Sequence, residues 1–217
     1  MQSIRGVFLL CALTVFALLG LAQDQPPPMS FFVTSVGSGD GAALGGLAGA
    51  DAHCQKLAES AGRGEATWRA YLSQASSGDL EQVNARDRIG SGPWHNAKGE
   101  IIAANLADLH EDRNNVRKYT ALNEKGEEVN GRGDQPNRHD ILTGSDSMGR
   151  LADPDPAVAT CNNWASSSDE LRTVVGHHDR LGGPNASWNS VHASRGCSQQ
   201  ALIGTGGDGL FYCFAAD

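Results

Sequence analysis

Apolar residues gather in short blocks that predict strands near both ends of the domain and one amphipathic helix near its start. The segment 30–36, SFFVTSV, is dense in aromatic and β-branched residues and predicts a first strand. The segments 67–73 (TWRAYLS) and 210–215 (LFYCFA) predict two more. Between the first two, apolar side chains recur at helical spacing, at Ala50, Cys54, Leu57, Ala58 and Ala61. Gly62 and Gly64 then end the predicted helix.

The middle of the chain carries shorter signals, separated by turn residues. They predict a short capped helix at 79–88, hairpins at 93–103 and 119–129, a helical turn at 106–111, and short strands at 141–143 and 172–175. From residue 131 to the last strand the chain is mostly loop. A few strands and helices around a loop-rich middle predict an α+β fold.

The first 28 residues have the pattern of an export signal followed by a spacer. Arg5 precedes an apolar run from 6 to 19 and small residues before Ala22, which predicts a signal peptide over 1–22. An uncleaved anchor is the alternative, although the run is shorter than the roughly 20 residues of a spanning helix. A proline-rich spacer covers 23–28, and one domain covers 29–217. No later segment is long and apolar enough to span a membrane.

Composition excludes several classes of protein. With 25 acidic and 17 basic residues the net charge is −8, so the chain would repel a phosphate backbone and is not expected to bind nucleic acid. Its 27 glycines follow no fixed period, which excludes a collagen repeat and favours irregular loops.

The domain contains four cysteines after the predicted signal peptide: Cys54, Cys161, Cys197 and Cys213. An even number in an exported chain predicts two disulfides, with three possible connectivities. Free thiols are the alternative. No close Cys-x-x-Cys pair is present, which argues against a zinc ribbon or a redox dithiol.

Several short motifs occur in the order in which they appear in the endostatin domain of collagens XV and XVIII. They are GGLAGADAHCQ (45–55), TWRAYLSQ (67–74), ARDRI (85–89), ILTGSDSMGRL (141–151) and LFYCFA (210–215). The chain resembles this family, including leptospiral endostatin-like proteins, over most of 30–215. The resemblance implies a C-type-lectin-like fold with a mixed, mostly antiparallel sheet, one or two helices and long loops. It also implies disulfides Cys54–Cys213 and Cys161–Cys197, and binding rather than catalysis.

The sequence departs from that family in two respects. Heparin binding by endostatin resembles an arginine-cluster mechanism, and this acidic chain has no run of basic residues. Endostatin's zinc site uses histidines at its extreme N-terminus, and the segment 23–30 contains none. Neither property is carried over to this chain.

Two loop segments are similar to the calcium-binding motifs of sugar-binding C-type lectins. Gln135-Pro136-Asn137 precedes Cys161, and Trp188-Asn189-Ser190 precedes Cys197. Calcium requires several oxygen ligands, and Ser190 stands where that family has an aspartate. Gln135, Asn137, Trp188 and Asn189 are therefore candidate ligand-binding residues, with a chance similarity as the alternative.

His177-His178-Asp179 is the densest group of metal-ligating side chains. Neighbouring residues on a strand point to opposite faces, so His177 could share an ion with Asp179 rather than with His178. Such a site needs further ligands from the remaining histidines, His95, His110, His139 or His192. Hydrogen-bonded histidines that hold loops together are the alternative.

The remaining candidates are weaker. Trp68 and Trp164 are expected in the core, whereas Trp94 and Trp188 lie in loops next to polar residues and are candidates for stacking on a sugar. Arg132-Gly133-Asp134 is interpreted as a chance tripeptide, and Asn185 fits a glycosylation motif. No sequence motif of a hydrolase or phosphate loop occurs, although Ser194 and His192 could converge with a carboxylate.

We therefore expect a secreted, non-catalytic module, extracellular, periplasmic or on the cell surface. It would recognise an extracellular glycan or matrix-type protein through the loops between 131 and 209. No cofactor is required by this expectation, although calcium and zinc are both conceivable. The first alternative is a structural or hydrolytic metal site around His177 and Asp179, and the second is a cell-surface structural protein without a small ligand.

Overall fold

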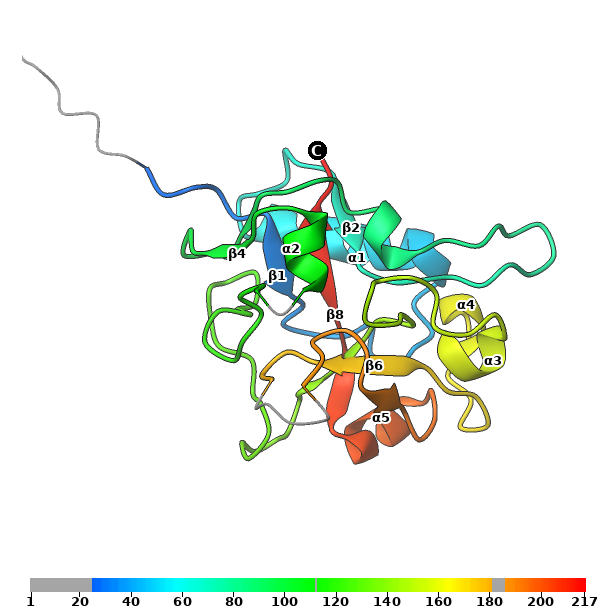
Figure 1. The fold of residues 1–217 in the computed structure, drawn as a ribbon. Coiled ribbons are helices and arrows are strands. Elements are labelled where there is room, and N and C mark those ends of the chain that lie inside the picture. The colour runs from blue at the N-terminus through cyan, green and yellow to red at the C-terminus, as the bar shows by residue number, and fades with distance from the viewer. Residues whose placement is uncertain (1–24, 112, 181–185) are drawn as a thin grey trace, which may run out of the picture.

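The computed structural model describes residues 25–111, 113–180 and 186–217 (Figure 1). The predicted signal peptide at 1–22 and the glycosylation candidate Asn185 lie outside these residues. Within them, no helix has both the length and the apolar character to cross a membrane. The described part of the predicted spacer, 25–28, has no regular secondary structure and is exposed.

The last strand, β8 (Gly207–Ala215), organises a six-stranded mixed sheet. Near its end it pairs antiparallel with β1 (Phe31–Val33) on one edge and β2 (Trp68–Ala70) on the other. Near its start it pairs parallel with β5 (Asp140–Leu142). From β5 the sheet continues antiparallel through β6 (Val174–His177) to the edge strand β7 (His192–Ala193).

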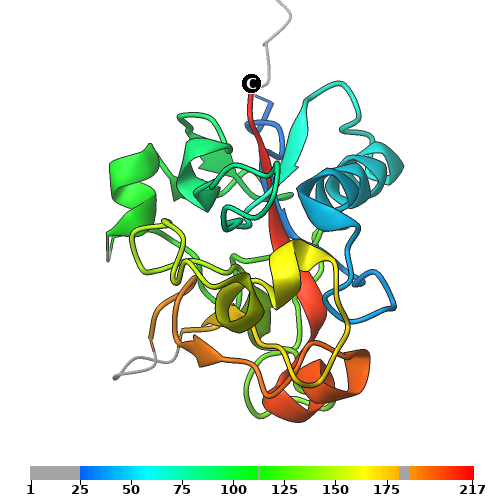
Figure 2. The same cartoon turned by 90° about the vertical axis from the view of Figure 1, so that its right-hand side faces the viewer.

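Strict alternation along β8 separates two hydrophobic cores. Phe211 and Cys213 point into a core that also contains α1, whereas Leu210, Tyr212 and Phe214 point into the opposite one. The second core is closed by a small hairpin of β3 (Trp94–His95) and β4 (Ile101–Ala103). Figure 2 shows α1 on one side of β8 and the green segments that include α2 on the other.

In the described residues, five α-helical segments surround the sheet. The longest is α1 (Gly46–Ser60), and α5 (Gln199–Thr205) leads into β8. The shorter ones are α2 (Leu106–His110), α3 (Pro156–Ala159) and α4 (Cys161–Trp164). All four residues of α4 have positive φ, so this segment is a left-handed turn, which costs about 1–2 kcal/mol per residue.

Two disulfides join distant parts of the domain, in the nested arrangement implied by the resemblance. Cys54 on α1 pairs with Cys213 on β8, at a sequence separation of 159 residues. Cys161 in the left-handed turn pairs with Cys197, 36 residues later. The predicted α+β class, the mostly antiparallel sheet and the disulfide connectivity are confirmed. Two disulfides also indicate an oxidising compartment, consistent with an extracellular location.

The helix predicted at 79–88 is wrong. Only a 3-10 turn, η1 (Ala85–Asp87), forms there. The chain before it folds back on itself, with backbone hydrogen bonds joining Gln74 to Val83 and Ser77 to Leu80. These bonds use the groups that a helix would need. The predicted hairpin at 119–129 is reduced to a turn with one isolated bridge between Leu122 and Glu128.

Candidate metal centre

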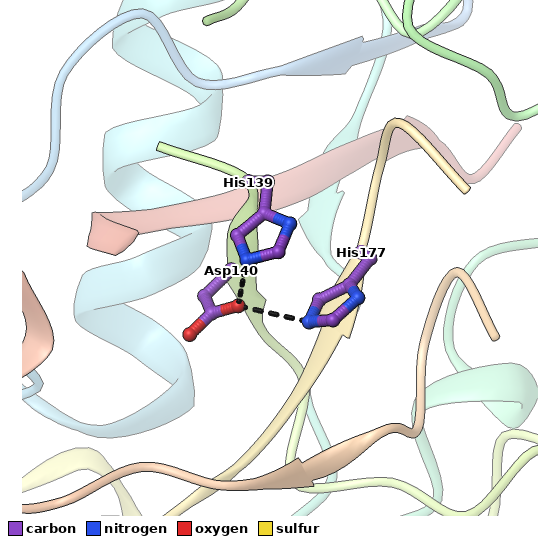
Figure 3. Close-up of side chains that lie close together, drawn as sticks. All are labelled: His139, Asp140 and His177. Carbon is purple, nitrogen blue, oxygen red and sulfur yellow. Dashed lines mark ion pairs between the residues drawn. The ribbon is translucent and has the colours of Figure 1, made fainter. Parts of the chain in front are cut away.

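The pairing of β5, β6 and β7 places three polar side chains on one face of the sheet. Asp140 on β5 lies directly opposite His177 on β6. His192 on β7 lies opposite Val175, two residues before His177, and so shares its face. His139 lies immediately before β5 and its ring turns toward the same point (Figure 3). The aliphatic residues Leu142 and Val175 continue this face into the first core.

The imidazole groups converge on a single carboxylate oxygen. The Nε2 atoms of His177, His139 and His192 lie 3.0, 3.1 and 3.7 Å from Oδ1 of Asp140. His139, Asp140 and His177 offer ligand atoms that all lie within 4.8 Å of one another. Asp140 is buried at 3% exposure, whereas the side chain of His192 is 37% exposed. The centre therefore lies at the rim of the core, with His192 on its solvent side.

These short contacts are not hydrogen bonds to the carboxylate. Both Asp140 oxygens are buried, and neither accepts a hydrogen bond with acceptable geometry from any residue in the described ranges. A buried carboxylate without such partners costs several kcal/mol unless a cation compensates it. The imidazole nitrogens thus lie close to the Asp140 carboxylate without donating a hydrogen bond to it, an arrangement that suits ligands of a common ion.

The Nδ1 atoms of His139 and His192 face protein acceptors. Nδ1 of His139 lies 3.5 Å from Oδ1 of the buried Asp179, and Nδ1 of His192 lies 3.2 Å from the carbonyl oxygen of Ala193. Acceptors at this position are typical of metal-bound histidines, because they fix the ring and keep the second nitrogen free for the ion. Burial acts to raise the pKa of Asp179, but contacts with His139 and the Arg132 N–H outweigh it and lower the pKa to about 2.

The donor set favours a transition metal. In a tetrahedral zinc site with bonds of 2.0–2.2 Å, neighbouring ligand atoms lie about 3.3–3.6 Å apart. The three Nε2–Oδ1 distances of 3.0–3.7 Å bracket that value, as does the 3.2 Å between Nε2 of His177 and Nε2 of His192. In the metal-free protein, the contact between Nε2 of His177 and Nε2 of His192 is a hydrogen bond between the two rings. Three imidazoles are poor ligands for calcium or magnesium, which prefer oxygen.

The structure brings together only part of the predicted cluster. His177 is in the centre, and two of the four histidines proposed as its partners, His139 and His192, join it. Asp179 lies behind His139 rather than beside His177. Nε2 of His178 lies 3.2 Å from the carbonyl oxygen of Asn130, and burial lowers the pKa of its ring to about 4.

The contacts do not support the predicted roles of three further residues, His95, His110 and Ser194. Nε2 of His110 lies 2.7 Å from the hydroxyl of Tyr71, in the second core. His95 lies in the hairpin strand β3, which belongs to the separate two-stranded sheet. The hydroxyl of Ser194 is buried and accepts the backbone N–H of Thr173.

The expectation that Trp94 and Trp188 are exposed contact residues is wrong. Both are buried, at 1% and 3% exposure. The ring of Trp94 packs edge-on against Phe214, and the indole N–H of Trp188 donates to the carbonyl of Leu109. Their polar neighbours Asn96 and Asn189 are buried as well, and His95 is half-buried, so polar residues beside the indoles did not indicate exposure. Neither ring has a face available for a sugar.

The similarity to lectin calcium motifs does not translate into a calcium site. Asn189 is buried, its amide donates to Tyr71 and Asp146, and its oxygen accepts from Ser187. Gln135 is exposed, and the side-chain oxygen of Asn137 accepts the N–H of His139. The hydrogen-bonding groups of Asn189 are therefore committed within the protein.

Asp140 is the ligand that the sequence reasoning missed. Its signal was the dipeptide His139-Asp140 directly before a predicted strand, combined with the alternation that places residue 140 on the face of residue 142. Comparison of the chain with models of protein families finds no match, and comparison with curated proteins also finds none.

Proposed function

We propose that this chain is an exported, non-catalytic binding module whose loop region is held together by a transition-metal ion, zinc in the first place. The ligands are His139, Asp140, His177 and His192. The observation that carries the proposal is the buried Oδ1 of Asp140, which three Nε2 atoms approach at 3.0–3.7 Å without a hydrogen bond to it.

The type of coordination favours a structural role. His139, Asp140 and His177 form the group of mutually close ligand atoms, and His192 would complete a tetrahedral shell from the solvent side. Filled shells are typical of structural zinc, whereas catalytic zinc keeps a position for water. The centre would join the edge strand β7, which pairs with β6 through only two residue pairs, to β5. Asp140 and Asp179 supply two negative charges against the two positive charges of the ion.

The endostatin-like, C-type-lectin-like fold is the finer classification that we propose. The nested disulfides and the mixed sheet support it. The partner proposed for the loops between 131 and 209 is an extracellular glycan or matrix-type protein. In the metal centre the chain departs from endostatin, whose zinc ligands come from its N-terminal histidines.

Zinc titration of the purified, disulfide-intact protein tests the proposal. The protein is first stripped with a chelator and then titrated against a chromophoric zinc indicator, and bound zinc is counted by mass spectrometry. We expect one zinc per chain. Asp140→Asn and His177→Ala are each expected to weaken binding at least 100-fold, since each removes a ligand.

His95→Ala is the matched control, because it removes a histidine from the separate hairpin sheet. Circular dichroism confirms that each variant is folded. Wild-type protein that binds less than 0.1 zinc per chain would overturn the proposal, as would equal weakening by His95→Ala.

A further inference from the structure

Asp179 connects the proposed metal centre to the loop 130–138. One of its oxygens, Oδ1, lies 3.5 Å from Nδ1 of His139. The other, Oδ2, accepts the backbone N–H of Arg132 at 2.6 Å. Asp179 is buried and therefore offers both oxygens to protein groups rather than to water. A single carboxylate thus contacts a metal-ligand ring and the backbone of a surface loop.

The loop is closely fitted to this carboxylate. A Cβ atom at Gly131 would lie 2.7 Å from Oδ2 of Asp179, so the backbone approaches as closely as glycine allows. A second anchor lies inside the loop, where Asp134 accepts the N–H of Gly131 at 2.8 Å and the ammonium of Lys118 at 2.5 Å. The tip beyond these anchors is exposed at Arg132, Gly133, Gln135 and Pro136.

From this geometry we infer that metal occupancy orders the loop 130–138. The inference rests on the proposed function. An ion on Nε2 of His139 leaves the proton of the neutral imidazole on Nδ1, where it is donated to Asp179. Asp179 is then fixed and holds the N–H of Arg132. Without the ion, the proton can occupy either nitrogen and this restraint is lost.

Thermodynamic linkage makes the coupling reciprocal. If binding of the ion favours the ordered loop, the ordered loop favours binding of the ion by the same coupling free energy. Any change that disorders the loop therefore lowers the affinity for the ion. Asp134→Ala removes a loop anchor and touches none of the proposed ligands. We expect this variant to bind zinc about 5-fold or more weakly, at the lower end of measured allosteric couplings.

Hydrogen exchange of the zinc-loaded and chelator-stripped protein tests the inference. Removal of zinc is expected to speed exchange of the amides at 131–137 at least tenfold and to leave those of α1 unchanged. In Asp179→Ala, zinc binding is expected to weaken 10- to 100-fold, as for other residues behind metal ligands. At saturating zinc, its loop is expected to exchange rapidly with and without the ion.

Asp155→Ala is the matched control for Asp134→Ala. Asp155 also accepts a backbone N–H in an exposed segment, that of Ala157 at the start of α3. Its removal is expected to leave zinc affinity unchanged. Two results would overturn this inference alone, while the wild type still binds one zinc per chain. One is a hydrogen-exchange rate of the loop that does not change when zinc is removed, and the other is an equal zinc affinity of the wild type and Asp134→Ala. A wild-type protein that binds no zinc overturns it together with the proposed function.

Discussion

Asp140 and His177 face each other across the antiparallel strands β5 and β6, with Oδ1 of the first 3.0 Å from Nε2 of the second. They are 37 residues apart in the sequence, since 177 − 140 = 37. Strand register alone brings them together, and it also places His192 on the same face. The centre is therefore a product of sheet pairing rather than of a local motif.

Zinc should stabilise the folded protein. A ligand that binds only the native state adds about 2.7 kcal/mol to the free energy of unfolding at a free concentration 100 times its Kd. Urea denaturation with and without zinc at that concentration measures the effect. Asp140→Asn, studied at the same zinc concentration, is expected to gain little stability from zinc. If zinc raised the free energy of unfolding of the variant as much as that of the wild type, zinc would bind at a different site.

The two disulfides should differ in their contributions to stability. Their sequence separations are 159 and 36 residues. The chain-entropy model then gives about 5 kcal/mol for Cys54–Cys213 and about 4 kcal/mol for Cys161–Cys197. Paired Cys→Ala variants, compared by urea denaturation under non-reducing conditions, measure both values. A larger loss from the shorter loop would show that the left-handed turn at 161–164 depends on its disulfide more than loop length predicts.

Gly176 on β6 should not tolerate a side chain. A Cβ atom there would lie 1.9 Å from the carbonyl oxygen of Trp188, which is backbone and cannot rotate away. Gly176→Ala is expected to lower the free energy of unfolding by about 3 kcal/mol or more. It should also weaken zinc binding, because the neighbouring His177 is displaced. Thermal denaturation and the zinc titration check the two effects.

Gly204 provides the control for that substitution. It lies in α5, and the nearest atom to its Cβ position is a guanidinium nitrogen of Arg195 at 4.0 Å. Gly204→Ala is expected to stabilise the protein by about 0.5–1 kcal/mol, since alanine is the better helix former. If both variants were equally destabilised, the close approach at Gly176 would not be the cause.

Acidification should destabilise the metal-free protein through His110. Burial lowers the pKa of this ring below its ordinary value of 6.5. Below pH 6.5 the unfolded chain takes up a proton that the folded chain refuses, so the free energy of unfolding falls as the pH falls toward the folded pKa. Above pH 6.5 the His110 ring is neutral in both the folded and the unfolded state, and its contribution to the free energy of unfolding is fully present.

Denaturation of chelator-treated wild type and His110→Gln between pH 5 and 7.5 isolates this contribution. The gap between the two stability profiles should narrow as the pH falls, because the variant has no ring to protonate. The remaining histidines titrate in both proteins and cancel in the difference. Parallel profiles would contradict the assignment to His110.

Segments with a strong local pattern could be predicted from the sequence. Phe211 to Phe214 form an apolar run whose residues fill both cores, and the stripe containing Cys54 and Ala58 is the buried face of α1. Helix α5 was missed because it buries only Leu202, so it has little apolar periodicity. Its boundary signal was Ser198, whose side chain caps the helix.

Long-range relationships were beyond the reach of local patterns. The group His177-His178-Asp179 drew attention to the correct strand, but the partner carboxylate, Asp140, depends on the register between β5 and β6. Trp94 was placed at the surface because its neighbours are polar. Its burial depends on Phe214, 120 residues away (214 − 94 = 120), which no local pattern could show.

X-ray absorption at the zinc edge of the loaded protein tests the metal centre most directly. The proposed centre predicts a four-coordinate ion with nitrogen and oxygen ligands at about 2.0–2.2 Å, the scattering signature of imidazole rings and no sulfur. In His177→Ala the imidazole contribution should decrease. A spectrum of six oxygen ligands without imidazole scattering would contradict a centre built from His139, Asp140, His177 and His192.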